Sequence, residues 1–126
     1  METTVYELAG GEEAIYNLAS AFYRRVFADH VMLPLFAHPD DDHVGRMALF
    51  LGELFGGPAE HTRQRGGRAT MAHIHHGLNI SNLQRERWIE HMRAACEEVN
   101  LPHEFLEVFE PQMQYFAALA QKESRS

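Results

Sequence analysis

The sequence predicts an all-α fold, and three observations support that prediction. Apolar residues recur at helical spacing along most of the 126-residue chain. No segment shows the apolar–polar alternation of a half-buried strand. Capping residues, glycines and prolines stand where the periodic stretches begin and end. Because this length fits one domain, we expect residues 1–126 to form a single helical domain, with residues 121–126 as a frayed tail.

The first long helix is expected over residues 12–28. Ile15, Leu18 and Phe22 belong to one apolar stripe at the i, i+3, i+4 and i+7 spacing of a helix. Two glutamates stand in the first turn, where the helix dipole favours carboxylates. A second stripe on the same helix contains Tyr23, so two faces of this helix should be covered.

The second helix is expected from Asp42 to Phe55, after an irregular stretch that contains Pro34 and Pro39. Aspartates at 40–42 are N-cap candidates, and Gly56-Gly57-Pro58 should end the helix. The helix carries two apolar stripes: Val44, Ala48, Leu51 and Phe55, and His43, Met47, Phe50 and Leu54. One stripe is enough for a small domain, so the second should face something else that is apolar.

The middle of the chain has weaker signals. Residues 59–67 show no periodicity and are expected to form a loop. Residues 69–76 have the pattern of one or two helical turns, which Gly77 would stop.

Two helices are expected in the last third of the chain. Ser81 and Gln84 have the spacing of a capping box, which predicts a helix from there to about Val99. A last helix should begin near Pro102, since proline suits a first helical turn. Pro111 should kink that helix or split it in two, because proline lacks the N–H that the helix needs.

Composition disfavours several classes of protein. The net charge of −7 would repel phosphate backbones, so a nucleic-acid partner is not expected. The single cysteine cannot form an internal disulfide, which is typical of a reducing compartment. No apolar run approaches the length of a bilayer span, and the first residues do not resemble a signal peptide. We therefore expect a soluble cytoplasmic protein without a membrane partner.

The chain contains nine histidines, six methionines and eight phenylalanines. Histidine is the side chain that most often binds a transition metal, which suggests a metal or haem protein. The densest cluster is His73-Ile74-His75-His76. A zinc hydrolase is disfavoured because the HExxH pattern is absent, whereas haem needs only one proximal histidine. Any one of these histidines could equally be an exposed side chain.

Two further sets of residues are candidates for binding. Tyr23, His43, Met47 and Trp88 each lie where a helix shows an extra apolar or aromatic face. They are either ordinary core residues or, because three of them carry hydrogen-bonding groups, the wall of a pocket for a polar ligand. Arg63, Arg65 and Arg68 lie within six residues of one another. They either bind an anion such as a pair of carboxylates or belong to a solvated loop.

Taken in order, several short motifs make the sequence similar to the truncated haemoglobins, and to group II of that family in particular. The motifs are Gly10-Gly11, Phe22-Tyr23, Leu35-Phe36, Phe50-Leu51, Phe55-Gly56-Gly57-Pro58, Gln64-Arg65-Gly66, and His75 followed by Ile80, Arg85 and Trp88. The resemblance covers nearly the whole chain, from Tyr6 to about Phe116. The resemblance implies a two-over-two helical sandwich around haem b.

The resemblance also implies roles for individual residues. The family's proximal histidine lies thirteen residues before the tryptophan, which selects His75, with His76 as the alternative. The distal side would be lined by Tyr23, Phe36, His43, Met47 and Trp88, and further haem contacts would come from Phe50 and Ile80. Two positions depart from group II: His43 replaces a small residue, and Ile74 replaces an arginine. Propionate pairing would then fall to Arg63, Arg65 or Arg68.

The function that the resemblance implies is reversible binding of dioxygen, and of other diatomics such as CO and NO, at ferrous iron. Such a protein would store, sense, transport or deliver dioxygen. The alternative is a haem enzyme that detoxifies nitric oxide or peroxide with a separate, unidentified reductase. A third reading is a helical interaction module in which the histidines are incidental. The sequence does not indicate an oligomeric state.

Overall fold

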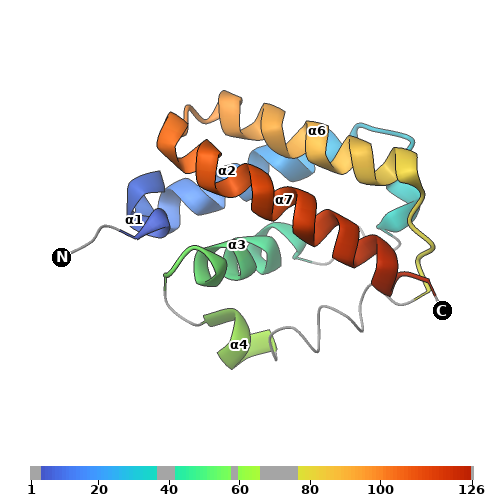
Figure 1. Ribbon diagram of the computed structural model, residues 1–126, viewed down its shortest axis with the longest axis horizontal. Coiled ribbons are helices and arrows are strands. Elements are labelled where there is room, and N and C mark those ends of the chain that lie inside the picture. The colour runs from blue at the N-terminus through green and yellow to red at the C-terminus, as the bar shows by residue number, and fades with distance from the viewer. Residues whose placement is uncertain (1–3, 37–41, 58–59, 66–76, 126) are drawn as a thin grey trace.

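Helices account for most of the described chain, which in this computed structural model comprises residues 4–36, 42–57, 60–65 and 77–125, apart from the side chains of residues 60 and 65 (Figure 1). In chain order the elements are α1 (Val5–Ala9), α2 (Gly11–Phe27), the 3-10 turn η1 (Leu33–Leu35), α3 (His43–Leu54), α4 (Glu60–Arg65), α6 (Asn82–Glu98) and α7 (His103–Glu123). No strand occurs within these ranges. The prediction of an all-α fold is confirmed.

Helix α2 lies at the centre of the arrangement, packed against both α3 and α6. Helix α7 packs against α6 and runs diagonally in front of the other helices in Figure 1, while α1 closes one end by contacting α2 and α7. The core between these elements is rich in aromatic rings. Phe55, at the end of α3, meets Phe105 and Phe109 of α7 with ring centroids 5.0 and 4.9 Å apart. All three rings are buried.

The helix starts that the sequence predicts are present. The Asp42 carboxylate caps α3 by accepting the N–H of Gly45 at 2.9 Å. Ser81 and Gln84 form the expected capping box, in which the Ser81 hydroxyl accepts the Gln84 N–H at 3.0 Å and the Gln84 amide oxygen accepts the Ser81 N–H at 2.9 Å. These caps fix where α3 and α6 begin.

The prediction of a loop over residues 59–67 is wrong for residues 60–65, which form α4. Two contacts to α3 explain this short helix. The carboxylate of Glu53 accepts the N–H of Thr62 at 2.8 Å and also its hydroxyl. His61 is buried, with its ring 5.5 Å from that of Phe50. Tertiary contacts hold α4 although its sequence lacks periodicity.

Pro111 does not split the last helix, because α7 is continuous from His103 to Glu123. A proline removes the N–H that would bind the carbonyl oxygen four residues earlier, here that of Glu107. Both Pro111 and Glu107 are exposed, so water can satisfy that oxygen. Of the two expected outcomes, a kink or a split, the split is therefore wrong.

The expectation of a frayed tail from residue 121 is also wrong for the described residues. Helix α7 continues to Glu123, and the side chains of Gln121 and Ser124 are buried. The Ser124 carbonyl oxygen accepts the N–H groups of Gly77 and Asn79, each at 3.1 Å, and the Ser124 hydroxyl accepts the Ile80 N–H at 2.9 Å. This end of α7 is ordered because it supplies hydrogen-bond partners to residues 77–80.

Replacing Ser124 with Ala is expected to destabilise the fold by about 1–3 kcal/mol, because the N–H of Ile80 then loses its partner in a partly buried place. Urea unfolding followed by far-UV circular dichroism measures this change. Ser20→Ala on the exposed face of α2 is the matched control, with an expected effect within about 0.5 kcal/mol. Equal midpoints for the two variants would contradict the structural role of Ser124.

Candidate functional site

Four rings from α2, α3 and the residue that follows η1 meet in a cluster, which we call the aromatic cluster: Tyr23, Phe27, Phe36 and His43. The His43 ring stacks on Tyr23 at 5.6 Å between centroids and meets Phe36 edge-on at 5.3 Å. Phe36 also meets Tyr23 edge-on at 5.6 Å. The cluster therefore brings together three residues that the sequence assigned to the distal side.

Tyr23 is the most deeply placed polar group of the aromatic cluster, with 7% of its surface exposed. Burial raises the pKa of its phenol, and the nearby positive charge of Arg46 opposes that rise only partly. The phenol consequently keeps its proton at neutral pH. A protonated phenol can donate a hydrogen bond, which a ligand carrying negative charge requires.

Helix α3 presents an apolar surface that its neighbours only half cover. Seven of its twelve residues are apolar, yet only Leu51 and Gly52 are buried in it. In the stripe that begins with His43, Met47 and Phe50 both pack against the core and remain half-buried. An inward apolar stripe with this exposure can accept a further apolar group.

Trp88 reaches the aromatic cluster through an intermediate ring. Its indole lies edge-on to Phe22 at 5.4 Å, and Phe22 in turn lies 5.0 Å from Tyr23. Trp88 is half-buried on α6, so a third helix contributes a hydrogen-bond donor to this side of the protein. Only the N–H of an indole can take part in such a bond, and it can only donate.

Phe50 connects α3 to two other helices. Its ring meets His61 of α4 and Phe116 of α7, each at 5.5 Å between centroids. Of the three candidate arginines, Arg63 lies on α4, which Phe50 and His61 thus tie to α3. The side chain of Arg65 and the whole of Arg68 lie outside the described residues.

The structure describes the chain just after the candidate proximal segment, from residue 77 onward. His73, Ile74, His75 and His76 lie outside the described residues. Ile80 is half-buried, and its backbone is held at both polar groups: the N–H donates to Ser124 and the carbonyl oxygen accepts the amide of Gln121 at 3.2 Å. The end of α7 thus fixes the chain that leaves this segment. Within the described ranges, no three His, Cys, Asp or Glu side chains converge as a metal site.

Sequence reasoning did not count Phe27, which shares the second stripe of its helix with Tyr23, or Arg46 among the site residues. Phe27 lies four residues after Tyr23, and Arg46 three residues after His43, so each shares a helix face with a residue already singled out. That spacing was the available signal. The approach of Arg46 to the Tyr23 phenol depends on the packing of α3 against α2, which periodicity does not report.

Comparisons with known proteins agree with this arrangement. Residues 4–122 match the profile of bacterial-like globins. The solved haemoglobin of Chloroflexus aurantiacus is 32% identical, with a TM-score of 0.87 over 94% of this chain and 98% of that one. A structure described as truncated oxygen-avid haemoglobin, from Bacillus subtilis, is 27% identical, with a TM-score of 0.83 over 94% and 98% of the two chains.

Curated relatives from two groups also match. A group 1 truncated haemoglobin of Tetrahymena pyriformis is 32% identical over 99 residues, which is 78% of each chain. The group 2 truncated haemoglobin YjbI of Bacillus subtilis is 29% identical over 77% of this chain and 73% of its own. The fold is that of a two-over-two globin. The chain belongs to the bacterial-like globin family, among the truncated haemoglobins, and is therefore a haem globin.

The described residues fit a large apolar group such as haem. The half-buried stripe of α3 would offer it an apolar surface. Tyr23, whose ring stacks on His43 of that stripe, adds a buried hydrogen-bond donor beside it. None of the helices in the described ranges is long and apolar enough to cross a membrane.

Proposed function

We propose that this globin reversibly binds dioxygen, and other diatomics such as CO and NO, at the ferrous iron of haem b. The observation that carries the proposal is the aromatic cluster, in which a buried protonated tyrosine and a histidine are held together beside the half-buried stripe of α3. Similarity to the truncated oxygen-avid haemoglobin of Bacillus subtilis supports the same proposal. In this proposal His75 is the proximal ligand, and Tyr23, His43 and Trp88 are the distal donors.

When bound, ferrous haem b supplies an iron position at which a diatomic ligand can bind. The chain's own residues then set how long the ligand stays. The Tyr23 phenol would donate to the ligand's negative end, and the Trp88 indole on α6 would be a second donor. Phe36 and Met47 provide apolar walls that keep water away, so each of these hydrogen bonds is stronger than it would be in solvent.

The decisive experiment measures dioxygen binding and nitric oxide turnover on the same preparation. Rapid mixing of the ferrous protein with dioxygen should show reversible binding, with the same spectrum after repeated removal and return of the gas. The oxygenated protein is then mixed with nitric oxide and a chemical reductant. Sustained catalytic turnover would favour the alternative, a haem enzyme served by a separate reductase.

His43 is expected to leave the ferrous iron five-coordinate when no ligand is present. Tyr23, Phe27 and Phe36 all contact its ring, at 5.6, 5.8 and 5.3 Å between centroids, and these contacts hold the ring within the aromatic cluster. Direct ligation needs a nitrogen–iron distance of about 2 Å, and the three ring contacts oppose a movement of the imidazole out of the cluster. We expect the ring to move only far enough to donate to a bound diatomic.

Visible absorption of the deoxygenated ferrous protein tests the role of His43. A five-coordinate iron gives one broad band in the visible region. Sharp, split bands that disappear in His43→Ala would show that His43 ligates the iron, contrary to this prediction.

At least one of Arg63, Arg65 and Arg68 is expected to pair with a haem propionate. An arginine guanidinium paired with a haem propionate slows the dissociation of haem. The corresponding Ala variant should therefore lose haem about 3- to 10-fold faster. Transfer of haem to an excess of a scavenging apoprotein measures the rate. Lys122→Ala on α7 is the control for loss of an exposed cation. Equal haem-loss rates in the three arginine variants and in Lys122→Ala would assign the arginines to a solvated surface.

A further inference from the structure

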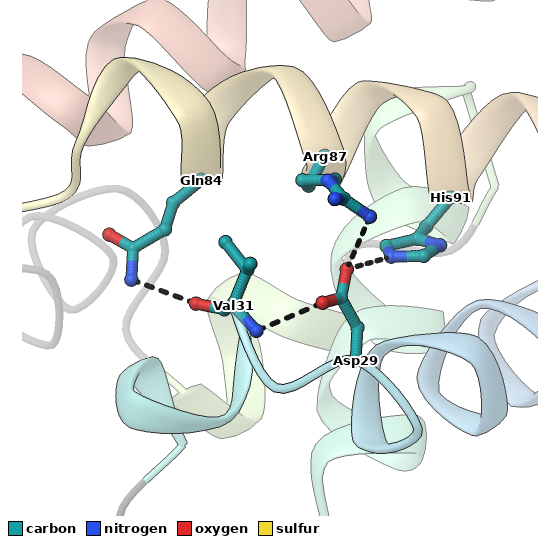
Figure 2. Close-up of polar contacts among 5 residues, drawn as sticks. All are labelled: Asp29, Val31, Gln84, Arg87 and His91. Atoms are coloured by element: carbon teal, nitrogen blue, oxygen red, sulfur yellow. Dashed lines mark hydrogen bonds and ion pairs between the residues drawn. The ribbon is translucent and has the colours of Figure 1, made fainter.

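Helix α6 grips the corner between α2 and η1 through a set of polar contacts, which we call the corner clamp: Asp29, the backbone of Val31, Gln84, Arg87 and His91 (Figure 2). His91 Nε2 lies 2.7 Å from Asp29 Oδ2, and Arg87 approaches the same oxygen at 3.5 Å. The Gln84 amide donates to the Val31 carbonyl oxygen at 3.0 Å. Three side chains of α6 thus hold Asp29 and Val31, two nearby residues of the corner.

Asp29 also organises the corner from within. Its second carboxylate oxygen, Oδ1, accepts the N–H of Val31 at 2.9 Å, and its carbonyl oxygen accepts the N–H groups of Met32 and Leu33, each at 3.1 Å. These bonds lead directly into η1, and Phe36 of the aromatic cluster is the residue that follows η1. A displacement of Asp29 would therefore pass along the backbone to Phe36.

Burial distinguishes this contact from other charged pairs of the protein. The His91 and Asp29 side chains are 18% and 10% exposed, whereas those of His103 and Glu107, a second histidine–carboxylate pair, are 81% and 66% exposed. The hydrogen bond from His91 lowers the pKa of the Asp29 carboxyl, so the carboxylate is charged at neutral pH. A bond to a charged, largely buried acceptor restrains its partners more than an exposed pair does.

The corner clamp and Trp88 share one face of α6. Gln84, Arg87, Trp88 and His91 follow the i, i+3, i+4 and i+7 spacing that places residues on one helical stripe. Trp88 therefore has a fixed position on α6 relative to the three side chains that contact the corner. On the other side of the contact, the corner follows directly on α2, which carries Tyr23, and continues through η1 to Phe36.

From this juxtaposition we infer that Asp29 and His91 are positioning residues for the distal pocket. Their bond holds the corner, and through it Phe36, in place relative to Trp88, and Phe36 packs edge-on against both Tyr23 and His43. The inference rests on the proposed function, since it assigns the two donors to one bound ligand. Arg25 and Glu98 independently join α2 to α6, with 2.9 Å between Nη2 and Oε1. Loss of the corner clamp should therefore shift the corner while the two helices stay docked.

The test compares His91→Ala with the matched control His103→Ala in the ferrous carbonmonoxy protein. Donors that face bound CO lower its stretching frequency, so that frequency reports their placement. We expect His91→Ala to raise and broaden the C–O band, and to speed dioxygen release by about 3- to 10-fold. Amide exchange at Val31, Met32 and Leu33 should accelerate about 10-fold. His103→Ala should match the unchanged protein in all three measurements.

Two conservative variants protect the test against simple loss of folding. His91→Gln keeps a donor that can reach Asp29 and should restore the C–O band, and Asp29→Asn should reproduce the shift with little change in side-chain shape. Faster amide exchange in His91→Ala with an unchanged C–O band and dioxygen release would overturn the inference, because the contact would then serve only the fold. If the unchanged protein carries no haem, it is the proposed function that fails, and the inference falls with it.

Discussion

Purified His75→Ala protein is expected to contain almost no haem, and added imidazole is expected to restore binding. The proximal histidine is the single covalent attachment of iron to a globin chain, so its removal leaves only apolar and propionate contacts. Free imidazole can enter the space left by the side chain and supply the missing nitrogen. The measurement is the ratio of Soret to protein absorbance after purification, with and without imidazole.

His76→Ala is the control for this assignment, since it removes the neighbouring imidazole of the same histidine cluster. It should retain haem at the level of the unchanged protein. If His76→Ala loses haem and His75→Ala keeps it, the proximal ligand is the next residue along the chain. The rest of the proposed site would not be altered by that result.

Trp88→Phe is expected to speed dioxygen release by a factor of about 10 or more. Phenylalanine keeps a ring against Phe22, where the indole lies edge-on at 5.4 Å, but it lacks the N–H. A hydrogen bond to a charged group contributes about 1.5–3 kcal/mol, and about 1.4 kcal/mol corresponds to a tenfold change in a rate or equilibrium constant. Stopped-flow displacement of dioxygen by CO measures the release rate.

Tyr23→Phe should be measured beside Trp88→Phe, because it removes the phenol donor while keeping its ring. Tyr16→Phe is the matched control, since Tyr16 lies on the same helix and is 50% exposed. A release rate that Trp88→Phe leaves unchanged would assign the stabilisation to Tyr23 and His43 alone. An effect of Tyr16→Phe as large as that of Tyr23→Phe would contradict the distal assignment altogether.

Local signals in the sequence were sufficient for much of the fold. The boundaries of α2, α3 and α6 follow from periodicity and from caps such as Asp42 and Ser81, which act within a few residues. The aromatic cluster could be anticipated in part, because Tyr23 and His43 each lie on a second apolar stripe. Such stripes indicate that a face is covered, although they do not identify what covers it.

The features that the sequence did not reveal depend on contacts between distant segments. Helix α4 is held by Glu53 and Phe50 of α3, and the end of α7 by the backbone of residues 77–80. The Asp29–His91 contact joins positions 62 residues apart, with no motif at either. Since these contacts form only once the helices are packed, no local pattern encodes them.

The central claim is that this chain is a haem globin whose iron takes up and releases dioxygen. The most direct measurement is the absorption spectrum of the purified ferrous protein, recorded while dioxygen is removed and returned over several cycles. The account predicts an intense Soret band that moves between the same two positions in each cycle. A protein without a Soret band, or one in which the first exposure to dioxygen irreversibly gives the ferric spectrum, would contradict it.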